Sequence, residues 1–242
     1  MRRYLIALGV LLVSLGWGGV TWAGIVIGGT RVIYPADQRE VTVQLSNNGE
    51  LPSLVQAWVD TGNPEASPED SEAPFVIFPP IARVEPGSGQ VLRLVFGGDR
   101  GLAEDRESLF WLNVLDVPPS PQRSEGDPVN FMQLAFRSRI KLFYRPPGLE
   151  GHADRAPAQL RWSLSRDPQG QPVLVGENPT PFYVNLSHLG LQGRSLEIGD
   201  GQLPPYGEVT FPLPGGVSRD VSRGEFTFIN DYGGRVTRDF SL

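Results

Sequence analysis

Cysteine is absent from this sequence of 242 residues, and histidine occurs only twice, as His152 and His188. Without cysteine the chain has no disulfide, no thiol nucleophile and none of the sulfur ligands of structural zinc sites. Neither histidine has a partner at metal-ligand spacing, so we expect both to be surface residues. The sequence therefore predicts no metal site.

The patterns of common catalytic sites are missing too. No Gly-x-Ser-x-Gly sequence indicates a hydrolase nucleophile. Gly28-Gly29-Thr30 follows a short strand pattern, but no helix pattern comes after it, which argues against a phosphate loop and a bound nucleotide. Carboxylates are plentiful, yet nothing selects one acid–base pair among them. We predict that the protein is not an enzyme and needs no cofactor.

An excess of basic residues is lacking as well. The chain has 21 Lys and Arg against 27 Asp and Glu, a formal net charge of -6. Nucleic-acid binding needs a basic face. We therefore expect no nucleic-acid partner.

The first 23 residues have the features of an export signal. Arg2 and Arg3 precede the apolar run 4–13, and Thr21-Trp22-Ala23 offers small residues at the two positions that a signal peptidase reads. A retained membrane anchor is the alternative, but the apolar run is short for a bilayer and glycines follow it. We predict export and cleavage after Ala23, which removes two arginines and lowers the formal charge to -8.

The rest of the chain consists of short apolar runs broken by the 29 Gly and 23 Pro, the pattern of a turn-rich all-β protein. We predict strands at 41–45, 54–59, 91–96, 110–117, 131–144, 160–164, 173–175, 182–191, 226–230 and 236–240. One helical turn is expected within Leu102–Ser108. Arg145-Pro146-Pro147-Gly148 interrupts the pattern, since prolines end a strand and glycine permits a bend. The spacing predicts two β-sandwiches in series, residues 24–147 and 148–242.

The pattern from Asn130 to Tyr144 is longer than a usual strand. Side chains two apart share a face, so Met132, Leu134 and Phe136 form one large apolar row. Facing the core of their own domain is the plain interpretation of that row. The length of the pattern, and the loop Pro118–Pro128 before it, which is rich in proline and charge, leave open that the strand extends beyond its sheet.

Five segments, in order along the chain, resemble the signatures of the periplasmic pilus (fimbrial) chaperones of the chaperone–usher pathway. They are Thr30-Arg31-Val32-Ile33-Tyr34, the run from Asp105 to Val114 (DRESLFWLNV), the run from Arg139 to Pro146 (RIKLFYRP), the run from Glu177 to Val184 (ENPTPFYV), and the run from Ile229 to Arg235 (INDYGGR). The resemblance covers nearly the whole chain after residue 23. It implies two immunoglobulin-like β-sandwiches at an angle with a cleft between them.

The resemblance also implies a mechanism. Such chaperones lend a long edge strand to a pilus subunit that lacks its last strand, and here Met132, Leu134 and Phe136 would fill the subunit's groove. Arg31 and Lys141 match the two basic residues that hold the subunit's terminal carboxylate, and Thr30 is expected to line the same cleft.

Three more matching positions, Glu107, Arg145 and Asp231, imply a charge network that sets the angle between the domains. The expected partners are pilus subunits and an outer-membrane usher, in the periplasm, without nucleotide, and an unloaded molecule could pair with itself through its apolar edge. Within the family, the modest length of the loop 118–128 and the absence of a cysteine pair resemble the short-loop chaperones, which build rod-like pili. A two-domain adhesin or carbohydrate-binding module is the alternative.

Overall fold

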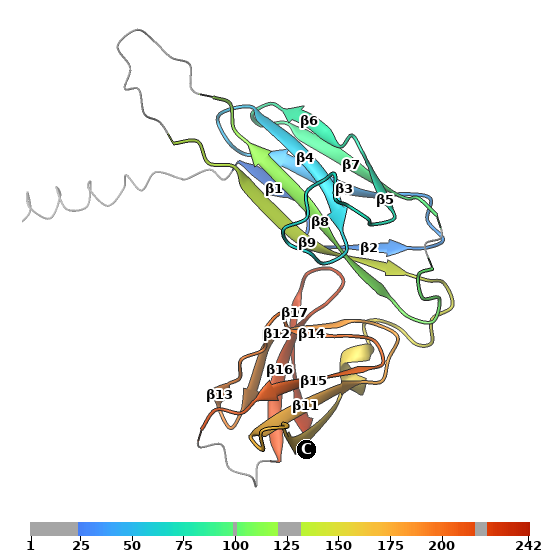
Figure 1. Cartoon of the computed structure of the whole chain (residues 1–242), viewed down its shortest axis with the longest axis vertical. Helices are drawn as coiled ribbons and strands as arrows, with labels where there is room; N and C mark the ends of the chain where they lie inside the picture. The colour runs from blue at the N-terminus through green and yellow to red at the C-terminus, as the bar shows by residue number, and fades with distance from the viewer. Residues whose placement is uncertain (1–23, 99–100, 121–131, 216–221) are drawn as a thin grey trace, which may run out of the picture.

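The computed structural model describes residues 24–98, 101–120, 132–215 and 222–242. Two β-sandwiches follow one another along the chain, and Figure 1 shows them end to end with their long directions inclined to each other. The predicted export signal, Asn130 and residues 121–128 of the predicted loop lie outside the described residues. In the described ranges, no helix is long and apolar enough to span a membrane.

The first sandwich packs a four-stranded sheet against a five-stranded sheet. Its strands are β1 (Ile25–Ile27), β2 (Arg31–Pro35), β3 (Val41–Asn47), β4 (Ser53–Asp60), β5 (Phe75–Phe78), β6 (Ile81–Val84), β7 (Gly89–Phe96), β8 (Ser108–Val117) and β9 (Phe136–Arg145). The sheet orders are β1-β3-β7-β5 and β2-β9-β8-β4-β6. Alternate residues, such as Val43 and Leu45 of β3, point inward and join one buried core, as period-two patterning requires.

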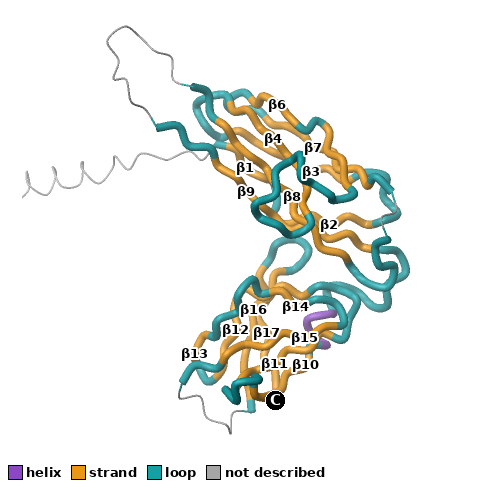
Figure 2. Tube along the Cα trace, in the orientation of Figure 1, coloured by secondary structure: helices purple, strands orange, loops and turns teal. Residues whose placement is uncertain are grey.

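The second sandwich has its own core, which is built around Trp162, Phe211 and Phe226. Its elements are the short helix η1 (Ala156–Gln159) and strands β10 (Arg161–Arg166), β11 (Pro172–Asn178), β12 (Val184–Leu191), β13 (Arg194–Ser195), β14 (Gln202–Leu203), β15 (Gly207–Pro212), β16 (Arg223–Ile229) and β17 (Arg235–Ser241). One sheet has the order β10-β11-β15, and the other has β13-β12-β16-β17 with β14 beside β12. Figure 2 shows strands and loops throughout, with η1 as the single helix among the segments it colours.

The chain changes sheets between β1 and β2. β1 pairs with β3 in one sheet, whereas β2 pairs in parallel with β9 in the other, from Arg31 opposite Lys141 to Pro35 opposite Arg145. On its other side β9 pairs with β8 from Phe136 to Tyr144. Residues 136–140 of β9 therefore have a neighbour on one side and, among the described strands, an open edge on the other.

The predicted all-β architecture is confirmed, and each of the ten predicted strands overlaps an observed one. The helical turn predicted within Leu102–Ser108 is wrong, since that segment is irregular up to the start of β8. The reason lies in the second sandwich: the backbone N–H of Glu107 donates to the carbonyl of Pro181 at 2.9 Å instead of to its own segment.

The long predicted strand from residue 131 begins at Phe136 instead. Asp116 is the last residue of β8 that pairs with β9, and Pro118 and Pro119 follow β8 directly. Proline has no N–H to donate, so the β8 ladder cannot continue beside residues 132–135. These residues project beyond the sheet without a strand partner among the described residues.

Candidate functional site

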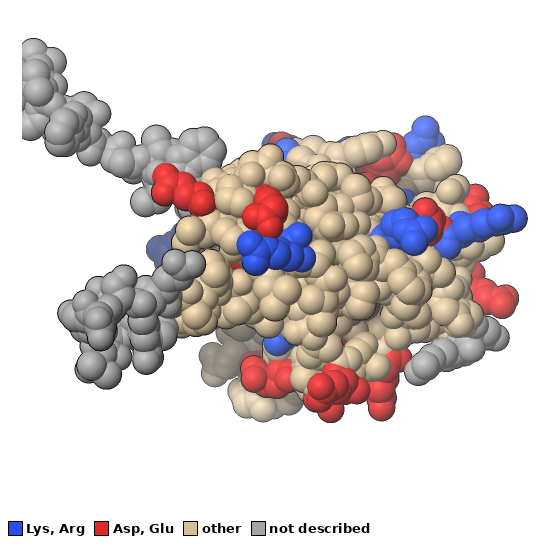
Figure 3. Space-filling model, turned by 90° about the horizontal axis from the view of Figure 1, so that it is seen from above, with Lys and Arg blue, Asp and Glu red and all other residues tan. Residues whose placement is uncertain are grey.

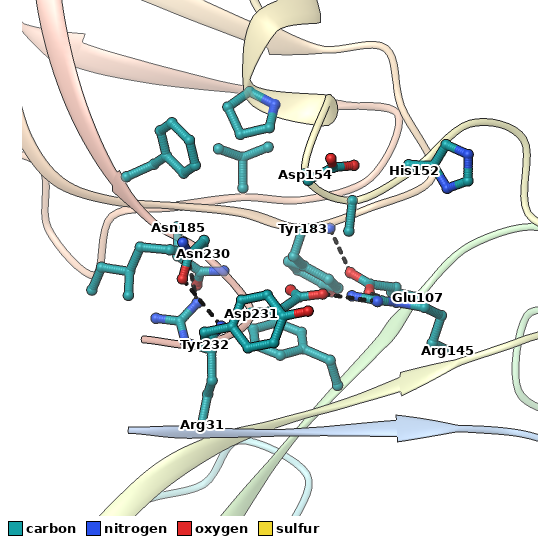
Figure 4. Close-up of a pocket in the computed structure, with 16 residues that line it drawn as sticks. Arg31, Glu107, Arg145, His152, Asp154, Tyr183, Asn185, Asn230, Asp231 and Tyr232 are labelled. Atoms are coloured by element: carbon teal, nitrogen blue, oxygen red, sulfur yellow. Dashed lines mark hydrogen bonds and ion pairs between the residues drawn. The ribbon is translucent and has the colours of Figure 1, made fainter. Parts of the chain in front are cut away.

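A cavity of about 310 Å³ lies where the two sandwiches meet. The first sandwich contributes Arg31 of β2 together with Phe143 and Arg145 of β9, and the second contributes Asn185 of β12 and the turn between β16 and β17. Figure 4 shows Arg31 rising from β2 toward that turn, with Arg145 beside Glu107. The cavity is a cleft between domains, and its lining contains both cations and carboxylates.

Arg31 and Lys141 are directly opposite each other in the parallel pairing of β2 with β9. Both side chains reach across to the second sandwich. Arg31 Nη1 donates to the carbonyl of Ile229 at 2.9 Å, and Lys141 Nζ donates to Asn185 Oδ1 at 2.6 Å. The structure thus brings the two sequence-predicted cations together where the open edge of β9 ends and its pairing with β2 begins.

Neither cation is neutralised by a close carboxylate. In the part of the chain that the structure describes, no Asp or Glu oxygen lies within the 4.0 Å of an ion pair from Arg31 or Lys141. Burial, together with the nearby charge of Arg31, lowers the pKa of Lys141 from 10.5 to about 8, although Asp200 opposes the shift. Burial also lowers the pKa of Arg31, and its buried Nε has no hydrogen-bond partner among the described residues. Such a pair favours an incoming anion.

Glu107, Arg145 and Asp231 form a charge network between the sandwiches. Arg145 Nε donates to Glu107 Oε1 at 2.7 Å, and Arg145 Nη1 donates to Asp231 Oδ2 at 2.9 Å. The Glu107 side chain is 2% exposed and also accepts the backbone N–H of Tyr183 at 2.7 Å. Burial raises the pKa of Glu107, while Arg145 opposes that rise. The network links the two sandwiches at one side of the cleft.

Thr30 and the two histidines occupy different places. Thr30 lies against the β16–β17 turn, where a Cβ atom on Gly233 would come within 2.7 Å of Thr30 Oγ1. Gly233 also has a φ of +83°, so glycine is required there for both reasons. His152 lines the cavity, and His188 lies 3.9 Å from Glu225 on the second sandwich. Among the described residues, no group of three or more His, Asp or Glu is arranged to hold a metal.

Met132, Leu134 and Phe136 are exposed, by 84%, 56% and 63% respectively. The plain interpretation, that they face the core of their own domain, is therefore wrong. Farther along β9, Leu142 is fully buried and Ile140 packs against the core. Because side chains two apart share a face, the exposed row continues the core-facing side of β9 past the end of the sandwich. An apolar row with an open backbone edge is a surface that another sheet can complete.

Asn185 is part of the site and was missed by the sequence analysis. It is 4% exposed and is the hydrogen-bond acceptor for Lys141. One signal was available, since Asn185 is a polar residue between the apolar Val184 and Leu186 in a predicted strand. A buried side-chain amide needs a partner, and such a position indicates a polar contact across the cleft.

Comparison with known protein families gives two matches in series. Residues 24–150 match the family described as "Pili and flagellar-assembly chaperone, PapD N-terminal domain". Residues 155–240 match "Pili assembly chaperone PapD, C-terminal domain". Together the two matches cover both sandwiches.

Individual proteins are similar over most of the chain. The chaperone protein FimB/FhaD of Bordetella pertussis is 46% identical over 217 residues, which cover 88% of this chain and 85% of the relative. The crystal structure of the Escherichia coli chaperone YadV is 39% identical, with a TM-score of 0.75 over 91% of this chain and 100% of that chain. The Salmonella enterica SafB chaperone, solved in complex with the SafA pilin, is 31% identical, with a TM-score of 0.76 over 90% of this chain and 96% of that chain.

Proposed function

This chain belongs to the PapD-like family of pilus-assembly chaperones, and from that premise we propose that it holds fimbrial subunits by completing their sheets with the strand that begins β9. Its role is that of a periplasmic chaperone and not of an enzyme. A two-domain adhesin or carbohydrate-binding module, the alternative at the level of the sequence, is not favoured by these matches. SafB, a similar chaperone, was solved with a pilin, which supports a pilus subunit as the partner here.

The observation that carries the proposal is the open edge of β9 beside an exposed apolar row. A subunit strand that pairs with residues 136–140 would satisfy backbone groups that have no strand partner among the described residues. Met132, Leu134 and Phe136 would then enter the subunit's groove. Burying each such side chain is worth about 1.5–3 kcal/mol, so the row contributes on the order of 5–9 kcal/mol before the costs of ordering are subtracted.

Arg31 and Lys141 would fix the end of the subunit strand. They stand where β2 begins to occupy the edge of β9, so a strand that pairs with residues 136–140 ends beside them. Its terminal carboxylate would meet two cations that have no close carboxylate of their own in the described structure. Hydrogen bonds to charged groups contribute about 1.5–3 kcal/mol each. The strand would run parallel to β9, with its C-terminus at the cleft.

The ion pairs of Arg145 with Glu107 and Asp231 would keep the cleft in shape. They join the residue just before β8, strand β9 and the β16–β17 turn, and so they hold Arg31 and Lys141 opposite Ile229 and Asn185. We assign this network to orientation, because a buried ion pair often only offsets its desolvation cost. Thr30, which packs on Gly233, would support the same turn.

The remaining parts of the proposal concern the cellular route. Cleavage after Ala23 would release the chain into the periplasm, where it would deliver its subunit to an outer-membrane usher. Unloaded molecules would pair through the exposed strand, because an apolar open edge tends to associate. The modest loop at 118–128 favours the short-loop branch of rod-like pili. The proposal needs no nucleotide, since the lent strand itself completes the subunit's fold.

Co-purification from the periplasm tests the proposal. A tagged wild-type chain should bring down a fimbrial subunit that mass spectrometry identifies. Arg31→Ala or Lys141→Ala should remain folded, as circular dichroism would report, yet recover no subunit. Normal recovery from either variant would refute the carboxylate anchor, and recovery of no subunit by the wild type would refute the chaperone role as proposed.

A further inference from the structure

Asp60 is a buried carboxylate that the proposed mechanism does not yet use. It ends β4 and is 1% exposed. Its oxygens accept Arg139 Nη2 at 2.6 Å and Nε at 3.0 Å, Asn113 Nδ2 at 2.7 Å, and the backbone N–H of Gly62 at 2.7 Å. Burial alone would raise the pKa of Asp60, but these bonds outweigh it and hold that pKa below its ordinary value. Asp60 is therefore a charged partner for Arg139.

Three cations alternate along β9, namely Arg137, Arg139 and Lys141. Side chains two apart share a face, so all three lie on the side opposite the apolar row. Arg139 and Lys141 even share one aromatic ring: their charged groups lie 4.1 Å and 5.6 Å from the ring centroid of Trp111. To a carboxylate that approaches along the open edge, these two neighbouring positions offer the same charge.

Arg137 is held mainly by other partners, although its Nη2 also lies 3.8 Å from Asp60 Oδ2. Its Nε donates to Asn113 Oδ1 at 2.9 Å, and its other nitrogens donate to the carbonyls of Pro64 and Ala66 at 2.6 and 3.3 Å. Its guanidinium also lies 4.7 Å from the ring centroid of Trp58. Arg137 thus has most of its donors used, which leaves Arg139 and Lys141 as the positions to compare.

Arg139 and Lys141 lie on the same face of β9, so the face of the strand does not decide which of them a subunit carboxylate meets. A slip by one residue turns every side chain of a strand to the wrong face, but a slip by two keeps the faces unchanged. A slip of the subunit toward Phe143 is blocked, because β2 already occupies that edge from Lys141 onward. A slip of two residues toward the tip meets no such barrier among the described strands, and it would place the terminal carboxylate beside Arg139.

We propose that Asp60 is a positioning residue that selects the register of the bound subunit by keeping Arg139 occupied, so that Lys141 is the cation of β9 that the terminal carboxylate meets. This inference rests on the proposed function. It explains why the Asp60–Arg139 ion pair lies where it does, which stability alone does not explain. The pair is next to Lys141 and on the same face of β9. The occupant of the site is the C-terminal carboxylate of a β-strand that runs parallel to β9.

Disulfide cross-linking can read the register directly, because the chain itself contains no cysteine. The chaperone carries Ser138→Cys, an exposed position on the open part of β9. The probe is the subunit that co-purifies with the wild type, with a cysteine placed in turn at successive residues of its last strand. In the wild type we expect one reactive position. In Asp60→Asn, a second reactive position should appear two residues nearer the subunit's C-terminus, with its share of the product raised about tenfold, equivalent to 1.4 kcal/mol.

The double variant Asp60→Asn/Arg139→Gln is the matched control, since it removes the freed cation along with the carboxylate. It should return to the single wild-type position, which a merely structural role of Asp60 would not bring about. Arg139→Lys is a milder second variant that keeps an ion pair with Asp60 but loses the bidentate fork, and it should show a smaller slipped share.

Three results would overturn the inference: an unchanged register in Asp60→Asn, equal slippage in the double variant, or an unchanged register in Arg139→Lys if Asp60→Asn does not fold. The proposed function itself would fail differently, through the absence of any cross-link in the wild type.

Discussion

Raising the pH from 7 to 9 should weaken the binding of a subunit, because the proposed anchor loses its proton. Burial lowers the pKa of Lys141 to about 8 in the unloaded chain. A bound carboxylate favours the charged ammonium, so the pKa of Lys141 should rise in the complex, and binding should take up a proton above pH 8. Affinity is therefore fully present below the unloaded pKa and falls as the pH passes above it.

The size of the effect follows from that pKa. At pH 9, one unit above a pKa of about 8, roughly one molecule in ten still carries the charge, so the Kd should rise about tenfold, or about 1.4 kcal/mol. The folding equilibrium moves in the opposite direction. The folded-state pKa lies below the ordinary value of 10.5, so the unfolded chain binds more protons between about pH 8 and 10.5, and the Lys141 contribution to folding stability rises with pH. Deprotonation of Lys141 therefore cannot cause loss of binding through unfolding.

Fluorescence anisotropy with a labelled peptide measures this effect. The peptide has the sequence of the last strand of the subunit that co-purifies, with a free C-terminal carboxylate, and a C-terminally amidated copy serves as a control. Lys141→Arg is the matched variant, since arginine stays charged throughout this range, and its profile should be flat. The reasoning is refuted if the wild-type Kd is unchanged from pH 7 to 9, or if Lys141→Arg shows the same tenfold rise.

Two further outcomes are expected. Leu134→Glu should reduce recovery of the subunit far more than Gln133→Glu in a pull-down, since only Leu134 belongs to the exposed apolar row; equal losses would count against the assigned face. Arg145→Ala should lower the free energy of unfolding by about 3–5 kcal/mol in chemical denaturation, because it leaves the Glu107 carboxylate buried without its ion-pair partner. Asp231→Asn should lower it by less than about 1 kcal/mol, since the Asp231 carboxylate is more exposed. A loss for Arg145→Ala no larger than that for Asp231→Asn would contradict this difference.

Much of the fold follows from local pattern. Val41–Leu45 alternates apolar and polar residues and ends in a turn, and it forms β3 with the alternate residues buried. Gly207–Pro212, by contrast, was not predicted as a strand, although it forms β15, because its apolar residues are few and only its pairing with β11 fixes its conformation. The irregular segment 102–107 could not be anticipated either, since the backbone N–H of Glu107 bonds to Pro181 in the other sandwich.

The same distinction applies to the site. Arg31, Lys141, Glu107, Arg145 and Asp231 were identified by resemblance to a family, because no local pattern reveals that residues 31 and 141 are partners across two strands. In the sequence, Asp60 is an ordinary polar residue at the end of a strand, and only the apolar neighbours of Asn185 set that residue apart. Their importance depends on contacts with Arg139 and Lys141, which are 79 and 44 positions away in the sequence. Only the assembled sheet brings these residues together.

Figure 3, a view onto the first sandwich from above, shows the basic residues (Lys and Arg) and the acidic residues (Asp and Glu) in small groups within a largely uncharged surface. On that visible face, the coloured atoms include no broad area of one sign. The charges that the proposed mechanism uses are instead mostly half-buried, in the cleft and along β9. Partial burial matters because charge–charge interactions are screened less there than in open water, so two cations can hold a single carboxylate firmly.

Hydrogen–deuterium exchange along the start of β9 tests most directly whether this strand is the one lent to a subunit. In the unloaded chaperone, kept dilute enough to be monomeric, alternate backbone amides of residues 136–140 face the open edge and should exchange quickly, while those bonded to β8 exchange slowly. On loading with the co-purified subunit, the fast amides should become protected. If the loaded complex leaves them fast and protects another surface instead, the strand that begins β9 is not the one that completes the subunit.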